Sequence, residues 1–97
     1  MIKYKYKVFY SKKFKKNLKK MLKQGKNIEK LLDVVDKLAL KEELNEKYKN
    51  HMLKDDKYYK NCGECHIEPD WLLVYQYYED ELILVLVNTG SHSDLFR

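Results

Sequence analysis

The sequence contains no apolar stretch long enough to cross a membrane. Its longest apolar run, Leu82–Val87, has six residues, whereas a transmembrane helix needs about 20. Residues 1–10 alternate lysine with apolar side chains and contain no continuous apolar segment of the kind that marks a secretory signal. We therefore expect a cytoplasmic protein with no membrane partner.

Cysteine is also scarce, with two residues that we expect to be free thiols in a reducing compartment. Cys62 and Cys65 have the C-x-x-C spacing of metal and redox sites, and nearby histidines could complete a zinc site. On a strand, however, positions three apart face opposite sides of the sheet. We therefore expect no metal and no cofactor, and we interpret Cys65 as a small core residue.

Acidic residues are nearly absent from the first thirty positions, which hold 12 lysines and a single acid, Glu29. This segment carries a net charge of +11 and the remainder of the chain carries −6. Such a lysine-rich surface suits a polyanion such as RNA, or an acidic protein partner. A solvated helix face would account for the charge equally well, and a first helix that binds anionic membranes is a further alternative.

The composition, with 44% hydrophobic and 36% charged residues over 97 positions, predicts one folded domain spanning residues 1–97. Period-two alternation predicts a strand over residues 2–10. Two helices follow, with Ser11 and Asn27 as their N-caps and Gly25 as the left-handed stop between them. The expected inner face of the second helix is Ile28, Leu31, Leu32, Val35 and Leu38.

Residues 41–58 are polar and irregular and predict a loop. Three strands are then expected at residues 59–67, 71–78 and 81–87, with turns at 69–70 and 79–80. The fold class is α+β with the order β-α-α-β-β-β: an antiparallel sheet with a two-helix hairpin packed on one face. The first strand can add at either edge or beside the last strand, and the opposite face of the sheet is expected to be free to form a groove.

Three histidines lie where predicted elements end: His51, His66 and His92. They could converge at one edge of the sheet, although three unrelated surface histidines would fit the spacing too. Metal-free RNA cleavage needs a base, an acid and positive charge near the phosphate, and imidazole can serve as acid or base near neutral pH. Trp71 and Phe96 neighbour two of these histidines in sequence and could hold a base, but Trp71 could equally be a core residue.

Three segments, Tyr48–His51, Glu64–Tyr75 and Thr89–Phe96, resemble in order and spacing the signature blocks of YafQ-type toxins of the RelE/ParE superfamily. This resemblance implies a RelE-like fold and a ribosome-dependent mRNA endonuclease that leaves a 2′,3′-cyclic phosphate. It also implies an acidic antitoxin of the DinJ or RelB type that wraps the toxin. The partners would thus be an antitoxin, the ribosome and mRNA, in a hetero-oligomer with the antitoxin or as a monomer when free.

The resemblance assigns roles to several residues. The catalytic set that it implies is His51, His66, Asp70 and His92, in which Asp70 could orient a histidine and favour its charged form. Trp71 and Phe96 match the aromatic residues that contact substrate. Further cations that we expect near the phosphates are Lys49, Lys60 and Arg97.

The sequence departs from the family at two positions. YafQ-like proteins usually carry arginine where this chain has Gly63 and Asn88, and the bidentate fork of arginine is a natural phosphate clamp that lysine does not reproduce. The alternative hypothesis is therefore a weakened or degenerate toxin that binds antitoxin or ribosome without efficient cleavage. Restoring both arginines would be expected to distinguish the two hypotheses.

Overall fold

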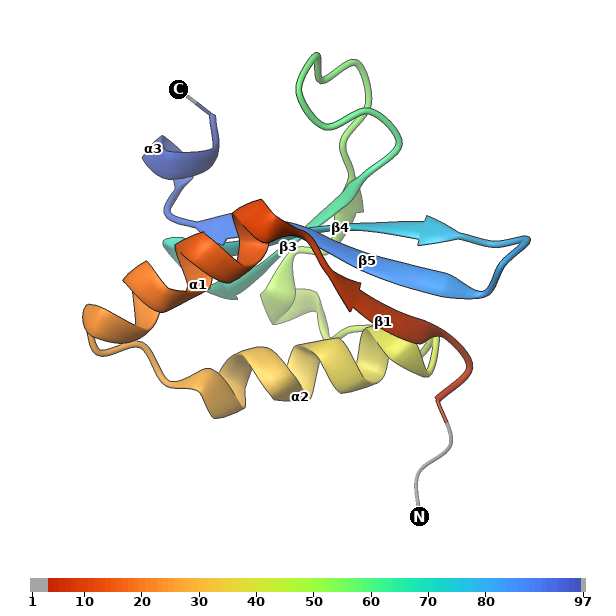
Figure 1. Cartoon of the computed structure of the whole chain (residues 1–97), viewed down its shortest axis with the longest axis horizontal. Helices are drawn as coiled ribbons and strands as arrows, with labels where there is room; N and C mark the ends of the chain where they lie inside the picture. The colour runs from red at the N-terminus through yellow and green to blue at the C-terminus, as the bar shows by residue number, and fades with distance from the viewer. Residues whose placement is uncertain (1–3, 97) are drawn as a thin grey trace.

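The computed structural model describes residues 4–96, which form a five-stranded sheet with the strand order β1-β5-β4-β3-β2 and two long helices (Figure 1). The elements in chain order are β1 (Lys7–Tyr10), α1 (Lys12–Lys23), α2 (Ile28–Ala39), the 3₁₀ helix η1 (Glu46–Tyr48), β2 (His51–Met52), β3 (Gly63–Glu68), β4 (Trp71–Tyr78), β5 (Ile83–Gly90) and α3 (His92–Leu95). The α+β class, both long helices and the three consecutive C-terminal strands are confirmed.

Strand β1 pairs in parallel with β5, so the sheet is mixed and the prediction of an entirely antiparallel sheet is wrong for this pair. A long crossover through α1, α2 and the other strands separates β1 from β5, which permits parallel pairing. The strand is also shorter than residues 2–10. Residues 1–3 lie outside the described part of the chain, and the backbone N–H of Tyr6 donates to the carbonyl of Ala39 in α2 instead of joining the sheet.

Both helices begin at the predicted caps. The Ser11 hydroxyl accepts a hydrogen bond from the Phe14 backbone N–H, and the Asn27 side chain accepts one from Glu29. Gly25 has a φ of +88°, which confirms the left-handed stop. The helices diverge from this turn (Figure 1). The predicted inner face of α2 is confirmed at Leu31, Val35 and Leu38. Ile28 and Leu32 are exposed instead, and Val34 and Ala39 are buried.

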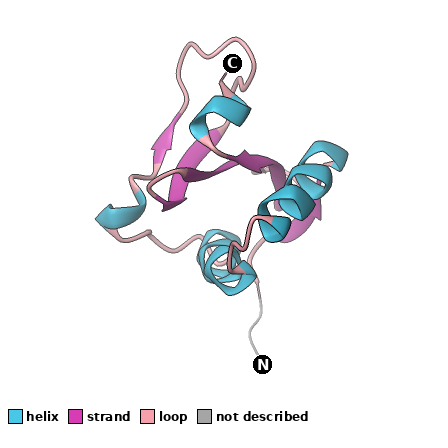
Figure 2. Ribbon diagram, turned by 90° about the vertical axis from the view of Figure 1, so that its left-hand side faces the viewer, coloured by secondary structure: helices cyan, strands magenta, loops and turns pink. Residues whose placement is uncertain are grey.

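The sheet has a core on each face. The larger core lies between the sheet and the two long helices and includes Phe14, Met21, Leu31, Trp71 and Leu84. A smaller core on the other face includes Tyr59, Cys62, Leu72, Val74 and Leu95, beneath the loop that follows β2 and beneath α3 (Figure 2). The second face is therefore partly covered, and the prediction that it is free is wrong.

The loop predicted at residues 41–58 contains η1 and β2, which the sequence pattern did not indicate. Strand β4 has the predicted bounds, whereas β3 begins at Gly63 and not at residue 59, and β5 runs later than predicted because residues 79–82 form a wider turn in which Leu82 has a φ of +53°. Helix α3 was not predicted. Within residues 4–96, no helix is both long and apolar enough to span a bilayer.

Trp71 lies at the start of β4 with none of its surface exposed. Its indole N–H donates to the Thr89 hydroxyl at 2.9 Å, and that hydroxyl donates to the Leu72 carbonyl at 2.7 Å. The side chain is thus fully enclosed, with its one polar atom satisfied by β5. Of the two roles open to Trp71, the structure favours the core residue.

This environment predicts the effect of Trp71→Phe. The substitution keeps an aromatic ring in the core but removes the indole N–H, so the free energy of unfolding should fall by about 1–3 kcal/mol. Thermal or urea unfolding would measure the loss, with Tyr58→Phe as an exposed aromatic control that should behave as wild type. An unchanged midpoint for Trp71→Phe would contradict the core assignment.

Candidate functional site

The carboxylate of Glu64 lies between two of the three histidines. His51 and Glu64 are cross-strand partners in β2 and β3, and His66 follows two residues later on the same face of β3. The Glu64 Oε1 atom is 3.5 Å from His51 Nε2 and 3.6 Å from His66 Nε2. Glu64 is only 4% exposed, so a buried carboxylate holds two more exposed imidazoles at one edge of the sheet.

The opposite nitrogen of each ring faces a backbone carbonyl. His51 Nδ1 is 2.8 Å from the Lys49 carbonyl, and His66 Nδ1 is 3.3 Å from the Pro69 carbonyl. Each imidazole therefore lies between a backbone carbonyl at Nδ1 and the Glu64 carboxylate beside Nε2. The contacts at Nδ1 are within hydrogen-bonding distance, whereas those to the carboxylate are longer ion-pair contacts.

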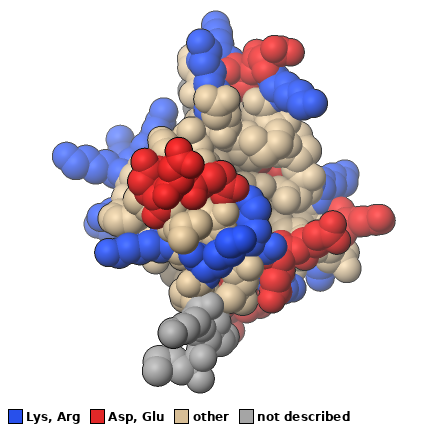
Figure 3. Space-filling view, turned by 90° about the vertical axis from the view of Figure 1, so that its right-hand side faces the viewer, with Lys and Arg blue, Asp and Glu red and all other residues tan. Residues whose placement is uncertain are grey.

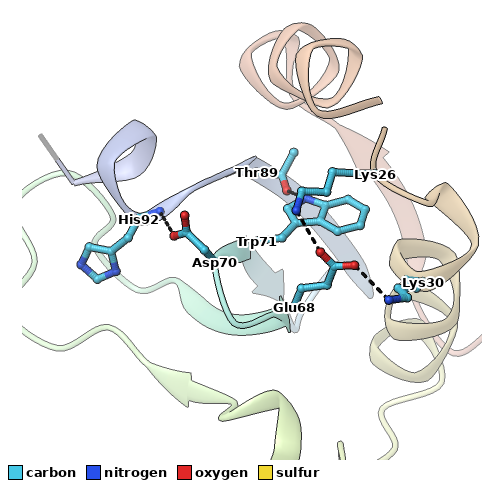
Figure 4. A network of polar contacts seen from close by, with 7 residues as sticks. All are labelled: Lys26, Lys30, Glu68, Asp70, Trp71, Thr89 and His92. Carbon is cyan, nitrogen blue, oxygen red and sulfur yellow. Dashed lines mark hydrogen bonds and ion pairs between the residues drawn. The ribbon is translucent and has the colours of Figure 1, made fainter. Parts of the chain in front are cut away.

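Asp70 connects the turn between β3 and β4 to α3. Its Oδ1 atom accepts a hydrogen bond from the backbone N–H of His92 at 3.1 Å, and the His92 imidazole points away from it (Figure 4). The contact of Asp70 is thus with the backbone of His92 and not, as expected, with a histidine ring. The neighbouring Glu68 binds Lys26 and Lys30, and the ammonium of Lys30, followed by that of Lys26, lowers the pKa of the Glu68 carboxyl.

Helix α3 presents His92 and Phe96 side by side, with ring centroids 5.0 Å apart. Ser91 and Asp94 form a capping box at the start of this short helix, and the hydrogen bond from the Ser91 backbone lowers the pKa of Asp94. Phe96 also packs edge-on against Tyr59. Phe96 is partly exposed, and its contact with a base stays a prediction.

The predicted catalytic residues thus fall into two groups attached to one turn. His51 and His66 share Glu64, and His66 also reaches the Pro69 carbonyl; Asp70, the next residue, holds the His92 backbone. Within residues 4–96, no hydrogen bond or ion pair joins the His92 imidazole to the Glu64 group. The structure therefore places the four residues on connected elements without direct contact between the two groups.

A groove of about 560 Å³ borders His66. Besides His66 and Ile67, its lining consists of three lysines, two acids, one aromatic residue and the turn proline: Lys30, Lys47, Lys49, Asp33, Glu68, Tyr48 and Pro69. Lys30 is paired with Glu68. Lys49 thus lies next to the candidate catalytic group, as a phosphate contact would. Lys60 lies farther along the chain in the exposed loop before β3, and Arg97 lies outside the described residues.

Gly63 and Asn88, at the two positions where the resemblance leads us to expect arginine, have structural roles. A Cβ atom at Gly63 would lie 2.4 Å from the Tyr75 ring, so no larger side chain fits there without displacing that ring. Asn88 is 1% exposed; its side chain accepts from Asn17 at 2.6 Å and donates to the Tyr59 hydroxyl at 3.0 Å. Arginine at either position would disrupt this packing, so restoring both arginines is not a clean test of activity.

The two cysteines face different cores. Cys65 belongs to the core under the helices and Cys62 to the smaller core on the other face. The two thiols therefore cannot coordinate the same metal ion. Both are buried, and burial raises the pKa of the Cys65 thiol to about 12. The interpretation of Cys65 as a core residue is confirmed, and the zinc or redox alternative has no support from this geometry.

The surface charge is mixed on the side that Figure 3 shows, where lysines surround separate acidic clusters. Glu64 is a candidate site residue that the sequence analysis did not single out, although it lies within one of the resembling segments. Its position two residues before His66 on a strand puts both on one face, which was the available signal. The cross-strand partner His51 could not be found this way because β2 itself was not predicted.

Comparison with known proteins assigns the family. Residues 6–97 match the family model described as the bacterial toxin of type II toxin-antitoxin system, YafQ. The mRNA interferase toxin YafQ of Escherichia coli strain B is 33% identical over 88 residues, which cover 90% of this chain and 91% of that protein.

Solved structures of this fold agree over nearly the whole chain. A metal-bound toxin from Helicobacter pylori is 46% identical with a TM-score of 0.87, covering 94% of this chain and 99% of its own. A chain of the E. coli DinJ–YafQ complex is 31% identical with a TM-score of 0.82, and the match covers 95% of this chain and 99% of that one. With the order of elements and the three sequence segments, these matches show that the chain belongs to the YafQ family, the toxin half of bacterial type II toxin–antitoxin systems.

Proposed function

We propose that this toxin is a ribosome-dependent endoribonuclease that cleaves mRNA by attack of the ribose 2′-hydroxyl, with histidines as acid and base. The observation that carries the proposal is the pair of imidazoles, His51 and His66, held by the buried carboxylate of Glu64 beside a groove that lysines and acids line together. The curated relatives are named mRNA interferases, which supports mRNA as the substrate.

The proposed reaction requires three catalytic contributions from the protein. A base takes the proton of the 2′-hydroxyl, an acid protonates the departing 5′-oxygen, and positive charge stabilises the phosphorane between them. His92 and either His51 or His66 form the acid–base pair, and the roles within that pair stay open. Glu64 and Asp70 position these histidines, one through the rings and the other through the His92 backbone.

The RNA strand would follow the groove beside His66. Lys49 lines this groove and would contact phosphate as a point charge, while Lys60 and Arg97 are proposed contacts farther along the strand. Phe96, next to His92, would stack on a base near the cut. Trp71 is omitted from this surface because it is fully buried.

The proposed partners are an acidic DinJ-like antitoxin, the ribosome and mRNA, and the proposed place of action is the cytoplasm. A YafQ relative is known in complex with DinJ, which supports the antitoxin. The basic character of residues 1–30 suits an acidic protein or rRNA. The alternative function is a toxin that binds these partners without efficient cleavage, which the departures at Gly63 and Asn88 motivate.

Cleavage by the purified toxin separates these two functions. We expect mRNA on translating ribosomes to be cut and its new end to carry a 2′,3′-cyclic phosphate, detectable by primer extension and by end-labelling before and after acid treatment. A cleavage-competent relative assayed in parallel is the control. Intact mRNA under conditions in which the relative cuts would contradict the enzyme and favour the binding-only alternative.

Substitution of the candidate groups tests the mechanism. His92→Ala and one of the two variants His51→Ala and His66→Ala should lower the cleavage rate by about 10²–10⁴-fold, the usual contribution of a general acid or base. The remaining variant should lose less, which identifies the second member of the pair. Glu64→Gln keeps the shape of the side chain but removes its charge, so it should lower the rate with little effect on antitoxin binding. The matched control is Glu81→Gln at an exposed turn position, which should cleave as wild type; equal losses in both glutamate variants would count against the mechanism.

A chelator tests the metal-free form of the mechanism. The Helicobacter relative is described as metal-bound, but within residues 4–96 of this chain no three His, Cys, Asp or Glu side chains are placed to hold a metal ion. We therefore expect excess EDTA, titrated against a Mg²⁺ level that keeps ribosomes intact, to leave the cleavage rate unchanged. Loss of cleavage that returning Zn²⁺ or Cu²⁺ restores would show that a metal takes part.

A further inference from the structure

We propose that Tyr75 is a positioning residue for His51, which it holds indirectly by tying Asn50 to the centre of the sheet across Gly63. This inference rests on the proposed function for its catalytic consequence. The structural claim, that Tyr75 fixes strand β2, depends only on the contacts of Tyr75. It can therefore be measured without measuring RNA cleavage.

Strand β2 needs such a restraint because little else holds it. It has two residues at the edge of the sheet, both exposed, and it pairs only with β3. The residue two positions before His51, Lys49, has left-handed backbone angles that are unfavourable for a lysine. A short edge strand with few buried contacts opens easily, and an opened β2 would carry His51 away from Glu64.

Tyr75 reaches this strand from two strands away. The ladder places Tyr75 of β4 opposite Gly63 of β3, and Gly63 opposite Met52 of β2. The Tyr75 ring lies over Gly63, and its hydroxyl donates to the Asn50 side-chain oxygen. Because Asn50 immediately precedes His51, this hydrogen bond anchors the start of β2 to the buried strand β4.

The close approach of the Tyr75 ring explains why residue 63 is a glycine. A Cβ atom at position 63 would lie 2.4 Å from Cζ and 2.5 Å from the hydroxyl oxygen of Tyr75, although Gly63 has no positive φ that would itself require glycine. Any side chain at this position would push the hydroxyl away from Asn50. The absence of a Cβ at residue 63 thus creates the path by which Tyr75 reaches Asn50.

Tyr75 acts from the opposite face of the sheet to the histidines. It belongs to the core under the helices and is 3% exposed, so it does not touch the reacting groups. Burial raises the pKa of Tyr75 to about 12, so the phenol keeps its proton and remains a donor throughout the physiological range. Tyr77, two residues along the same strand, donates a comparable hydrogen bond to the Leu38 carbonyl in α2.

This pair of tyrosines supplies a matched experiment. Tyr75→Phe and Tyr77→Phe each remove one hydroxyl from the same face of β4, but only the first contacts β2. We expect Tyr75→Phe to speed amide hydrogen exchange at His51 and Met52, to shift the His51 ring signals in NMR spectra, and to lower kcat by about tenfold with little change in KM, the equivalent of one hydrogen bond. Tyr77→Phe should leave all three readouts near wild type.

A double-mutant cycle with Asn50→Ala tests the contact itself. Asn50 is exposed, so its truncation should not unfold the protein, and the double variant Asn50→Ala/Tyr75→Phe should lose no more activity than either single variant. Additive losses, equal effects of the two tyrosine variants, or unchanged exchange at β2 in Tyr75→Phe would each overturn the proposal. If the wild type itself fails to cut RNA while exchange at β2 responds to Tyr75→Phe, the proposed function fails and the positioning of His51 stands.

Discussion

The turn of Pro69 and Asp70 between β3 and β4 is the constraint that unites the candidate site. Its Pro69 carbonyl faces the His66 ring, its Asp70 carboxylate holds the His92 backbone, and Trp71, the residue after it, bonds to Thr89 in β5. A tight turn between two hydrogen-bonded strands has few ways to move, so groups attached to it keep their relative positions. Histidines 26 residues apart in sequence thereby belong to one framework.

A second set of contacts fixes α3, whose four residues could not persist as a free helix. The Asn88 side chain links Asn17 of α1 to the Tyr59 hydroxyl, and that hydroxyl donates to the Leu95 carbonyl. One buried amide in β5 thus connects α1 to the loop that carries Tyr59, and through Tyr59 to α3. Both its oxygen and its nitrogen have hydrogen-bond partners, as is usual for a buried polar group. The position of His92 and Phe96 therefore depends on the packing of α1 as well as on the local capping box.

The sequence was sufficient to predict those elements whose signals are local. Caps at Ser11 and Asn27, the stop at Gly25 and the bounds of β4 follow from residue type and periodicity, and all are confirmed. The parallel pairing of β1, the two-residue β2 and the bridging role of Glu64 depend on which strands become neighbours, which periodicity cannot specify. For the same reason, Trp71 looked equally suited to a core and to a base-stacking surface until its bond to Thr89 was known.

The structure also changes the interpretation of the two positions at which arginine was expected. From sequence alone, Gly63 and Asn88 suggested a phosphate clamp that had been lost. In the structure both positions are filled by other interactions: the Tyr75 ring occupies the space above Gly63, and Asn88 is enclosed between α1 and Tyr59. In the proposed mechanism the charge would come from elsewhere, from the lysines that share the groove beside His66 with Asp33 and Glu68. Because an ammonium is a point charge without the fork of a guanidinium, this site would stabilise the phosphorane by proximity of charge and not by bidentate geometry.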